Sequence, residues 1–144
     1  MASRRDMAQE VEARAGGRCE YCRMHQSLQG ATFHLEHVVP RSRGGLSQPN
    51  NLAWACPSCN LRKANRVQVI DPDTGNQVPL FNPRADNWAS HFRWQGYRVV
   101  GHTPLGRATV AALELNHPRR LQIRQAEELF DLFPPNDVSE GAAL

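Results

Sequence analysis

The N-terminal segment has the pattern of an amphipathic helix. Ser3 and Asp6 have the spacing of a capping box, and apolar residues follow at helical intervals as far as the glycine pair at 16–17. Glycine after the last periodic residue is a common helix stop. We therefore expect a helix over 3–15 that packs on the segment behind it.

The stretch TFHLEH alternates between apolar and polar positions. Phe33 and Leu35 fall on one side, and His34 and Glu36 fall on the other. This period of two is typical of a half-buried strand, because successive side chains point to opposite faces. The polar face of the predicted strand therefore carries His34 and Glu36.

A turn-rich stretch, PRSRGGLSQPNN, separates this strand from a second apolar one, LAWA at 52–55. The following segment, PSCNLRKANR at 57–66, has a proline in its first turn and no internal breaker, which favours a short helix. The predicted order is strand, strand, helix, with the two strands paired as a hairpin.

Beyond residue 66 the pattern predicts an α/β extension. VQVI and QVPLF flank the turn cluster DPDTGN and predict a hairpin, while YRVV reads as a strand. Two further segments, PLGRATVAALELN and HPRRLQIRQAEELFDLF, predict helices. In RADNWASHFRW the helical spacing of aromatic residues predicts another helix whose side chains are core, namely Trp88, His91, Phe92 and Trp94. We divide the chain into 1–66, an extension at 67–133 and a flexible tail at 134–144.

Charge separates the two halves. Residues 1–66 hold 10 Lys and Arg against 5 Asp and Glu, whereas residues 67–144 hold 7 against 9. A basic half suits a polyanion such as nucleic acid, although a solvated basic face is the alternative. No apolar run is long enough to cross a bilayer and the N-terminus does not read as a signal sequence, so we expect a cytoplasmic protein without membrane contact.

The cysteines form two C-x2-C pairs with none left over: Cys19 and Cys22, then Cys56 and Cys59. Two such pairs can supply four thiolates to one structural Zn²⁺. Disulfides are disfavoured in a cytoplasmic protein, and a redox pair would not come doubled. The 33 intervening residues would be stapled as a hairpin between the two pairs.

The motifs EHVVPRSRGG, NNL and CPSCNLRK, in this order between residues 19 and 66, resemble the HNH endonucleases, the ββα-metal nucleases, in the branch braced by two CxxC pairs. The resemblance implies an α+β fold: a small zinc-braced ββα-metal module with an N-terminal helix and a C-terminal α/β extension. It implies His37 as general base, Asn51 as a loop brace, and Lys63 near the phosphate. Glu36 and Asn60 become ligands of a catalytic Mg²⁺ or Mn²⁺, with His34 a candidate further ligand.

Phosphodiester hydrolysis independently needs these residue types. An imidazole titrating near neutrality can take a proton from water, and a hard cation on oxygen ligands can neutralise charge on the phosphoryl group. Arginine and lysine can hold the DNA backbone without reading sequence. The candidates for that contact are Arg41, Arg43, Arg62, Lys63 and Arg66.

Two functions follow from this pattern. The first is a metal-dependent endonuclease that hydrolyses DNA, with RNA still open as a substrate. The alternative is a catalytically weak, zinc-braced module that binds nucleic acid without cutting it. The set of Glu36, His37 and Asn60 favours the nuclease, because a binding module has no need of a base beside a ligand pair. A redox or zinc-storage protein would leave His37 and the arginines unexplained. Oligomeric state and substrate preference cannot be read from the sequence.

Overall fold

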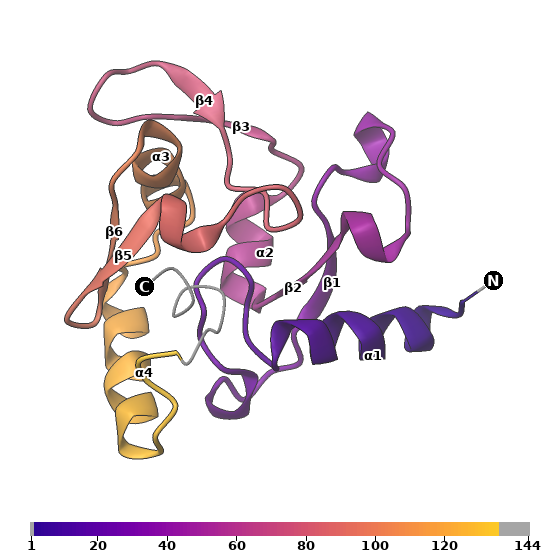
Figure 1. The fold of residues 1–144 in the computed structure, drawn as a ribbon, viewed down its shortest axis with the longest axis horizontal. Coiled ribbons are helices and arrows are strands. Elements are labelled where there is room, and N and C mark those ends of the chain that lie inside the picture. The colour runs from indigo at the N-terminus through magenta and orange to yellow at the C-terminus, as the bar shows by residue number, and fades with distance from the viewer. Residues whose placement is uncertain (1, 136–144) are drawn as a thin grey trace.

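The computed structural model describes residues 2–135. Helix α1 (Arg4–Ala15) is capped as expected, since Ser3 Oγ accepts from Asp6 N at 3.1 Å and Asp6 accepts from Ser3 N at 3.3 Å. Gly16 ends the helix in the left-handed region, with φ of 64°. The helix packs on the hairpin behind it (Figure 1), where Arg14 donates to the carbonyls of Pro49 and Leu52.

The predicted strand, strand, helix order is confirmed. Strand β1 (His34–His37) pairs antiparallel with β2 (Leu52–Ala55), and Glu36 lies opposite Ala53. Helix α2 (Pro57–Lys63) follows directly and lies against β1. The intervening loop contains two short 3-10 helices, η2 (Arg41–Arg43) and η3 (Pro49–Asn51).

The extension consists of two more hairpins and two helices. Strands β3 (Gln68–Ile70) and β4 (Gln77–Pro79) pair across the predicted turn, and β5 (Phe92–Gln95) pairs with β6 (Arg98–Gly101). Helices α3 (Pro104–Ala112) and α4 (Pro118–Leu129) close it. The three hairpins do not merge into one sheet in the described residues, and Figure 1 shows the extension gathered on one side of the β1–β2 hairpin.

The helix predicted for RADNWASHFRW is wrong. Only Trp88–Ser90 form a 3-10 turn, and Phe92 begins strand β5. Phe92 and Trp94 lie two residues apart on one face, and both stack with Trp88, at 4.9 and 5.3 Å between ring centroids. Pairing with β6 outweighs the helical spacing of the aromatics. The expectation that they belong to the core holds for Trp88 and Phe92, which are buried, and for Trp94, which packs against that core, whereas His91 is only half-buried.

One apolar core runs through both parts of the chain. It includes Val11 of α1, Leu52 of β2, Phe81, Val99 of β6 and Leu113 after α3. The boundaries drawn at 66 and 133 stay predictions, and residues 136–144 of the expected tail lie outside the described residues. Among residues 2–135, no helix is long and apolar enough to cross a membrane.

Candidate active site and zinc cluster

The four cysteines meet at one buried point. Their Sγ atoms all lie within 4.8 Å of one another, and Cys22 Sγ is 3.8 Å from Cys56 Sγ. Ligands at the Zn–S distance of about 2.3 Å in a tetrahedron stand about 3.8 Å apart, so the donor set and its spacing fit a closed zinc site. All four are free thiols, and no disulfide joins them.

The start of helix α2 positions the second cysteine pair, Cys56 and Cys59, for the four-cysteine cluster. Cys56 is the N-cap of α2, and its Sγ accepts from Cys59 N at 3.3 Å. Pro57 occupies the first helical position, where its fixed φ suits a helix start. The cluster therefore fixes the start of α2 to the segment holding Cys19 and Cys22.

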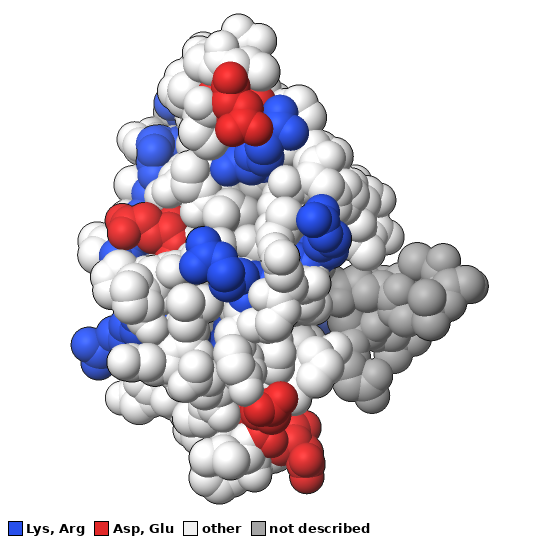
Figure 2. All heavy atoms as spheres, turned by 90° about the vertical axis from the view of Figure 1, so that its left-hand side faces the viewer, with Lys and Arg blue, Asp and Glu red and all other residues white. Residues whose placement is uncertain are grey.

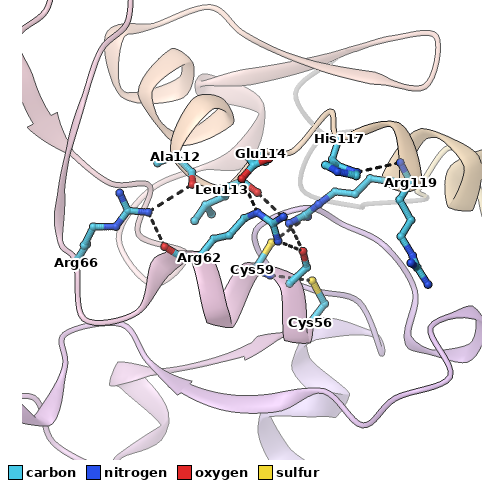
Figure 3. Close-up of polar contacts among 11 residues, drawn as sticks. Cys56, Cys59, Arg62, Arg66, Ala112, Leu113, Glu114, His117 and Arg119 are labelled. Atoms are coloured by element: carbon cyan, nitrogen blue, oxygen red, sulfur yellow. Dashed lines mark hydrogen bonds and ion pairs between the residues drawn. The ribbon is translucent and has the colours of Figure 1, made fainter.

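Helix α4 supplies a buried cation to the cluster, which sequence reasoning missed. Arg120 is 3% exposed and donates to Cys59 Sγ at 3.2 Å, to Ser58 Oγ at 3.0 Å and to the Leu113 carbonyl at 2.9 Å. In Figure 3 the side chain of the neighbouring Arg119 points away from Cys56 and Cys59. Four thiolates around one Zn²⁺ carry a net negative charge, which a guanidinium offsets. No local pattern marks Arg120, because its partners lie some 60 residues earlier in the chain.

His37 ends strand β1 with its imidazole partly exposed. Its Nε2 lies 2.8 Å from Ser47 Oγ, which orients the ring. Burial lowers the pKa of His37, and the positive charges of Arg41, Arg4 and Lys63 lower it further. The imidazole is therefore neutral at physiological pH, the form in which it can accept a proton. Arg4 and Ser47 were not among the sequence candidates.

Asn51 holds the loop that follows His37. Its Oδ1 accepts from Val39 N at 3.0 Å, and its Nδ2 donates to the carbonyls of Val39 at 3.0 Å and Leu46 at 2.9 Å. The same loop needs Gly45, because a Cβ there would lie 1.7 Å from the Val39 carbonyl oxygen. Asn51 was expected to brace this loop, and these hydrogen bonds are the contacts that such a role needs.

Glu36 is not on a solvent-facing strand surface as the alternation suggested. It is 5% exposed, and its two carboxylate oxygens are both engaged: Oε1 accepts from the Tyr21 hydroxyl at 2.6 Å, and Oε2 pairs with Lys63 Nζ at 2.6 Å. Burial raises the pKa of Glu36, while the Lys63 ammonium and the Tyr21 hydroxyl oppose that shift. Helix α2 closes over this face of the hairpin, so the polar side chain is enclosed.

Lys63 is also buried, at 1% exposed, and donates to the His37 carbonyl at 3.2 Å. Its ammonium thus faces Glu36 and the strand rather than open solvent. Asn60, one helical turn earlier, is half-buried on the same side of α2, while His34 is exposed. Among residues 2–135, the four cysteines are the single group of three or more His, Cys, Asp or Glu ligand atoms that lie close together.

The candidate DNA-binding arginines lie around the loop and α2. Arg41 and Arg43 are exposed on η2, and Arg43 Nε donates to the Asn65 carbonyl at 3.1 Å. Arg62 pairs with Glu114 at 3.0 Å. Arg66 donates to the carbonyls of Arg62 and Ala112 (Figure 3), and within residues 2–135 no carboxylate pairs with it.

A pocket of about 260 Å³ opens beside the end of β1. Its walls come from Val38 and Val39, from Lys63 and Arg66, and from the segment 79–86 of the extension. The polar groups on that last wall are Asn82 and Asp86. Lys63 therefore separates the buried Glu36 from a solvent-connected hollow.

Comparisons with known proteins agree with this arrangement. The family model described as HNH endonuclease matches residues 19–66, one third of the chain. The Septu protein PtuB of Bacillus thuringiensis is 26% identical over 113 residues, which is 74% of this chain. The chain spans 40% of that relative's length. No solved structure gives a significant match. Residues 19–66 thus match the HNH endonuclease domain, and they contain the β1–β2 hairpin, helix α2 and four cysteines whose geometry suits zinc.

Proposed function

We propose that this chain hydrolyses DNA phosphodiester bonds, with His37 as the general base and one divalent metal ion. The observation that carries the proposal is the position of His37: its neutral, partly exposed imidazole stands at the end of β1, oriented by Ser47 and followed by a loop that Asn51 braces. A base held in this way can take a proton from an attacking water. Family membership supports a nucleic-acid substrate.

Glu36 and Asn60 are the residues that would hold a catalytic Mg²⁺ or Mn²⁺. A carboxylate and an amide oxygen are donors that hard cations prefer, and Glu36 already has a cation, the Lys63 ammonium, against one oxygen. When bound, such a metal would neutralise charge on the phosphoryl oxygens. His34 stays a candidate further ligand, since it lies two residues from Glu36 on the same strand.

The residues that would contact DNA lie on the HNH domain and not on the extension. Arg41, whose charge acts on His37, and Arg43 are exposed on η2, and Arg66 is exposed near the end of α2. Figure 2 shows that the outer face of the extension differs, because its basic groups are scattered and alternate with acidic ones. We therefore place the backbone contacts on the loop and α2, where they add affinity without sequence preference.

One observation favours the alternative of a binding module with weak catalysis. Both oxygens of Glu36 are occupied by protein groups, so a metal site on that residue is not ready-made. A module that only binds would show salt-dependent DNA affinity and no metal-dependent cleavage. The two functions therefore differ in one assay.

Purified zinc-loaded protein should nick or cut supercoiled plasmid with Mg²⁺ or Mn²⁺ and stop with moderate EDTA, which a closed four-thiolate site resists better than an open one. His37→Ala should cleave about 10² to 10⁴ times more slowly, because it lacks the base, but bind DNA and fold normally. His102→Ala, an exposed histidine of the extension, is the matched control. Wild-type cleavage by His37→Ala would remove the base assignment, and absent cleavage with every metal would leave the binding module.

A further inference from the structure

The chain contains a single lysine, Lys63, among 17 basic residues. Every other cation is arginine, including all those on the surface, and the one lysine is buried between α2 and β1. Arginine carries a rigid, planar fork, whereas a lysine ammonium is a compact point charge on a flexible stem. The basic residue that contacts Glu36 therefore carries its charge as a compact ammonium on a flexible stem, which suits a change of position.

The contacts of Lys63 resemble those of a bound cation. Its Nζ lies 2.6 Å from Glu36 Oε2 and 3.2 Å from the His37 carbonyl oxygen. Two oxygen ligands from successive strand residues thus converge on one positive charge. The other oxygen of Glu36 is fixed by Tyr21, so a second cation cannot approach that side without breaking a 2.6 Å hydrogen bond.

We propose that Lys63 is a displaceable internal cation: it holds Glu36 when no divalent metal is present and leaves that carboxylate when Mg²⁺ or Mn²⁺ binds. The inference rests on the proposed metal-dependent function. An ammonium and a divalent ion repel each other, and both cannot sit on Oε2 in a buried site. Metal-free protein thereby avoids an unpaired buried carboxylate.

The pocket beside β1 gives the displaced side chain a destination. Lys63 already forms part of its wall, and Asp86 lies on the same pocket. A lysine stem can rotate into a solvent-connected hollow of about 260 Å³ without moving α2. The freed ammonium then faces this pocket, which is lined by Val38 and Val39 just after His37, and there it can meet a substrate phosphate.

Because the chain has one lysine, selective labelling reports on this group alone. We would grow the full chain with ¹³C,¹⁵N-lysine, load it with zinc and record the side-chain Cε and Nζ signals while adding Mg²⁺. We expect one buried ammonium signal that is replaced by a shifted, rapidly exchanging one. Plasmid cleavage is measured on the same samples. Cleavage with an unchanged Lys63 signal overturns the exchange and leaves the proposed function standing; a changed signal without cleavage supports the exchange and overturns the proposed function.

Substitutions test the competition by affinity. The apparent affinity for a metal is reduced by the fraction of molecules whose site is free, so Lys63→Met should bind Mn²⁺ at least about tenfold more tightly than wild type. Tyr21→Phe removes the other contact of Glu36 without removing a cation and should change the affinity much less. Glu36→Gln should no longer bind Mn²⁺ at this site. Equal or weaker Mn²⁺ binding by a folded Lys63→Met overturns the proposal, and if that variant does not fold, the lysine signal of the wild type decides.

Discussion

Arg120 offers the sharpest test of how the extension supports the HNH domain. Replacing it by Met keeps an apolar stem but removes three hydrogen bonds, to Cys59 Sγ, Ser58 Oγ and the Leu113 carbonyl. A bond to a charged thiolate is worth about 1.5 to 3 kcal/mol and each neutral one about 1 kcal/mol. The sum, about 4 kcal/mol, is a large part of the about 5 to 15 kcal/mol that stabilises a typical domain.

At about 2 to 4 °C per kcal/mol for a chain of this size, Arg120→Met should lower Tm by about 8 to 16 °C. The assay is circular dichroism melting of zinc-loaded protein, with zinc release followed by a chromogenic chelator. Arg119→Met is the matched control, because the side chain of that exposed neighbour points away from the cysteines in Figure 3. If both variants melt within about 2 °C of wild type, as surface substitutions do, the guanidinium does not stabilise the cluster.

Two further variants test the loop and the extension. Asn51→Ala removes three hydrogen bonds from the loop after His37, so we expect kcat to fall about 10²-fold with zinc content unchanged, and a wild-type kcat would contradict the brace. Asp71 pairs with Arg107, whose hydrogen bonds hold the pKa of that carboxyl at about 2, below its unfolded value of about 3.9. The depressed pKa stabilises the fold above pH 4, and this effect is lost as pH falls toward 2. Asp71→Asn should therefore have a lower free energy of unfolding than wild type at pH 6. Urea unfolding should show that this difference between the two proteins is smaller at pH 3. A difference in unfolding free energy that does not change with pH would refute the stabilising role of the Asp71 carboxylate.

The elements of the N-terminal part, from α1 to α2, were predictable because each has a local signal. Ser3 and Asp6 cap α1, Pro57 starts α2, and the turn-rich loop separates two short apolar strands. The cysteine spacing likewise predicted a cluster that the fold brings together. Local chemistry sufficed in these cases, because the residues that decide each element lie within a few positions of it.

The burial of Glu36 was not predictable from alternation. A period of two identifies the faces of a strand, but it does not show what covers each face. Here α2 covers the side that carries Glu36, and Lys63 and Tyr21 satisfy its charge. The spacing of Asn60 and Lys63 placed them on one helix face, yet whether that face meets solvent or strand depended on packing. Tertiary contact also decided β5, whose pairing with β6 replaced the expected helix.

Contacts from the end of the described chain reach back to its beginning. Besides Arg120, the Glu127 carboxylate accepts from His25 N at 2.7 Å, and the Leu132 carbonyl accepts from Arg18 at 2.7 Å. During synthesis on the ribosome, residues 19–66 emerge well before these partners. In a nascent chain that ends near residue 66, the four cysteines are present but the Arg120 guanidinium is not. Helix α4 is also missing, so it cannot cover the first cysteine pair. We therefore expect this segment to stay weakly folded, and the activity proposed for it to stay latent, until residue 132 has emerged from the ribosome.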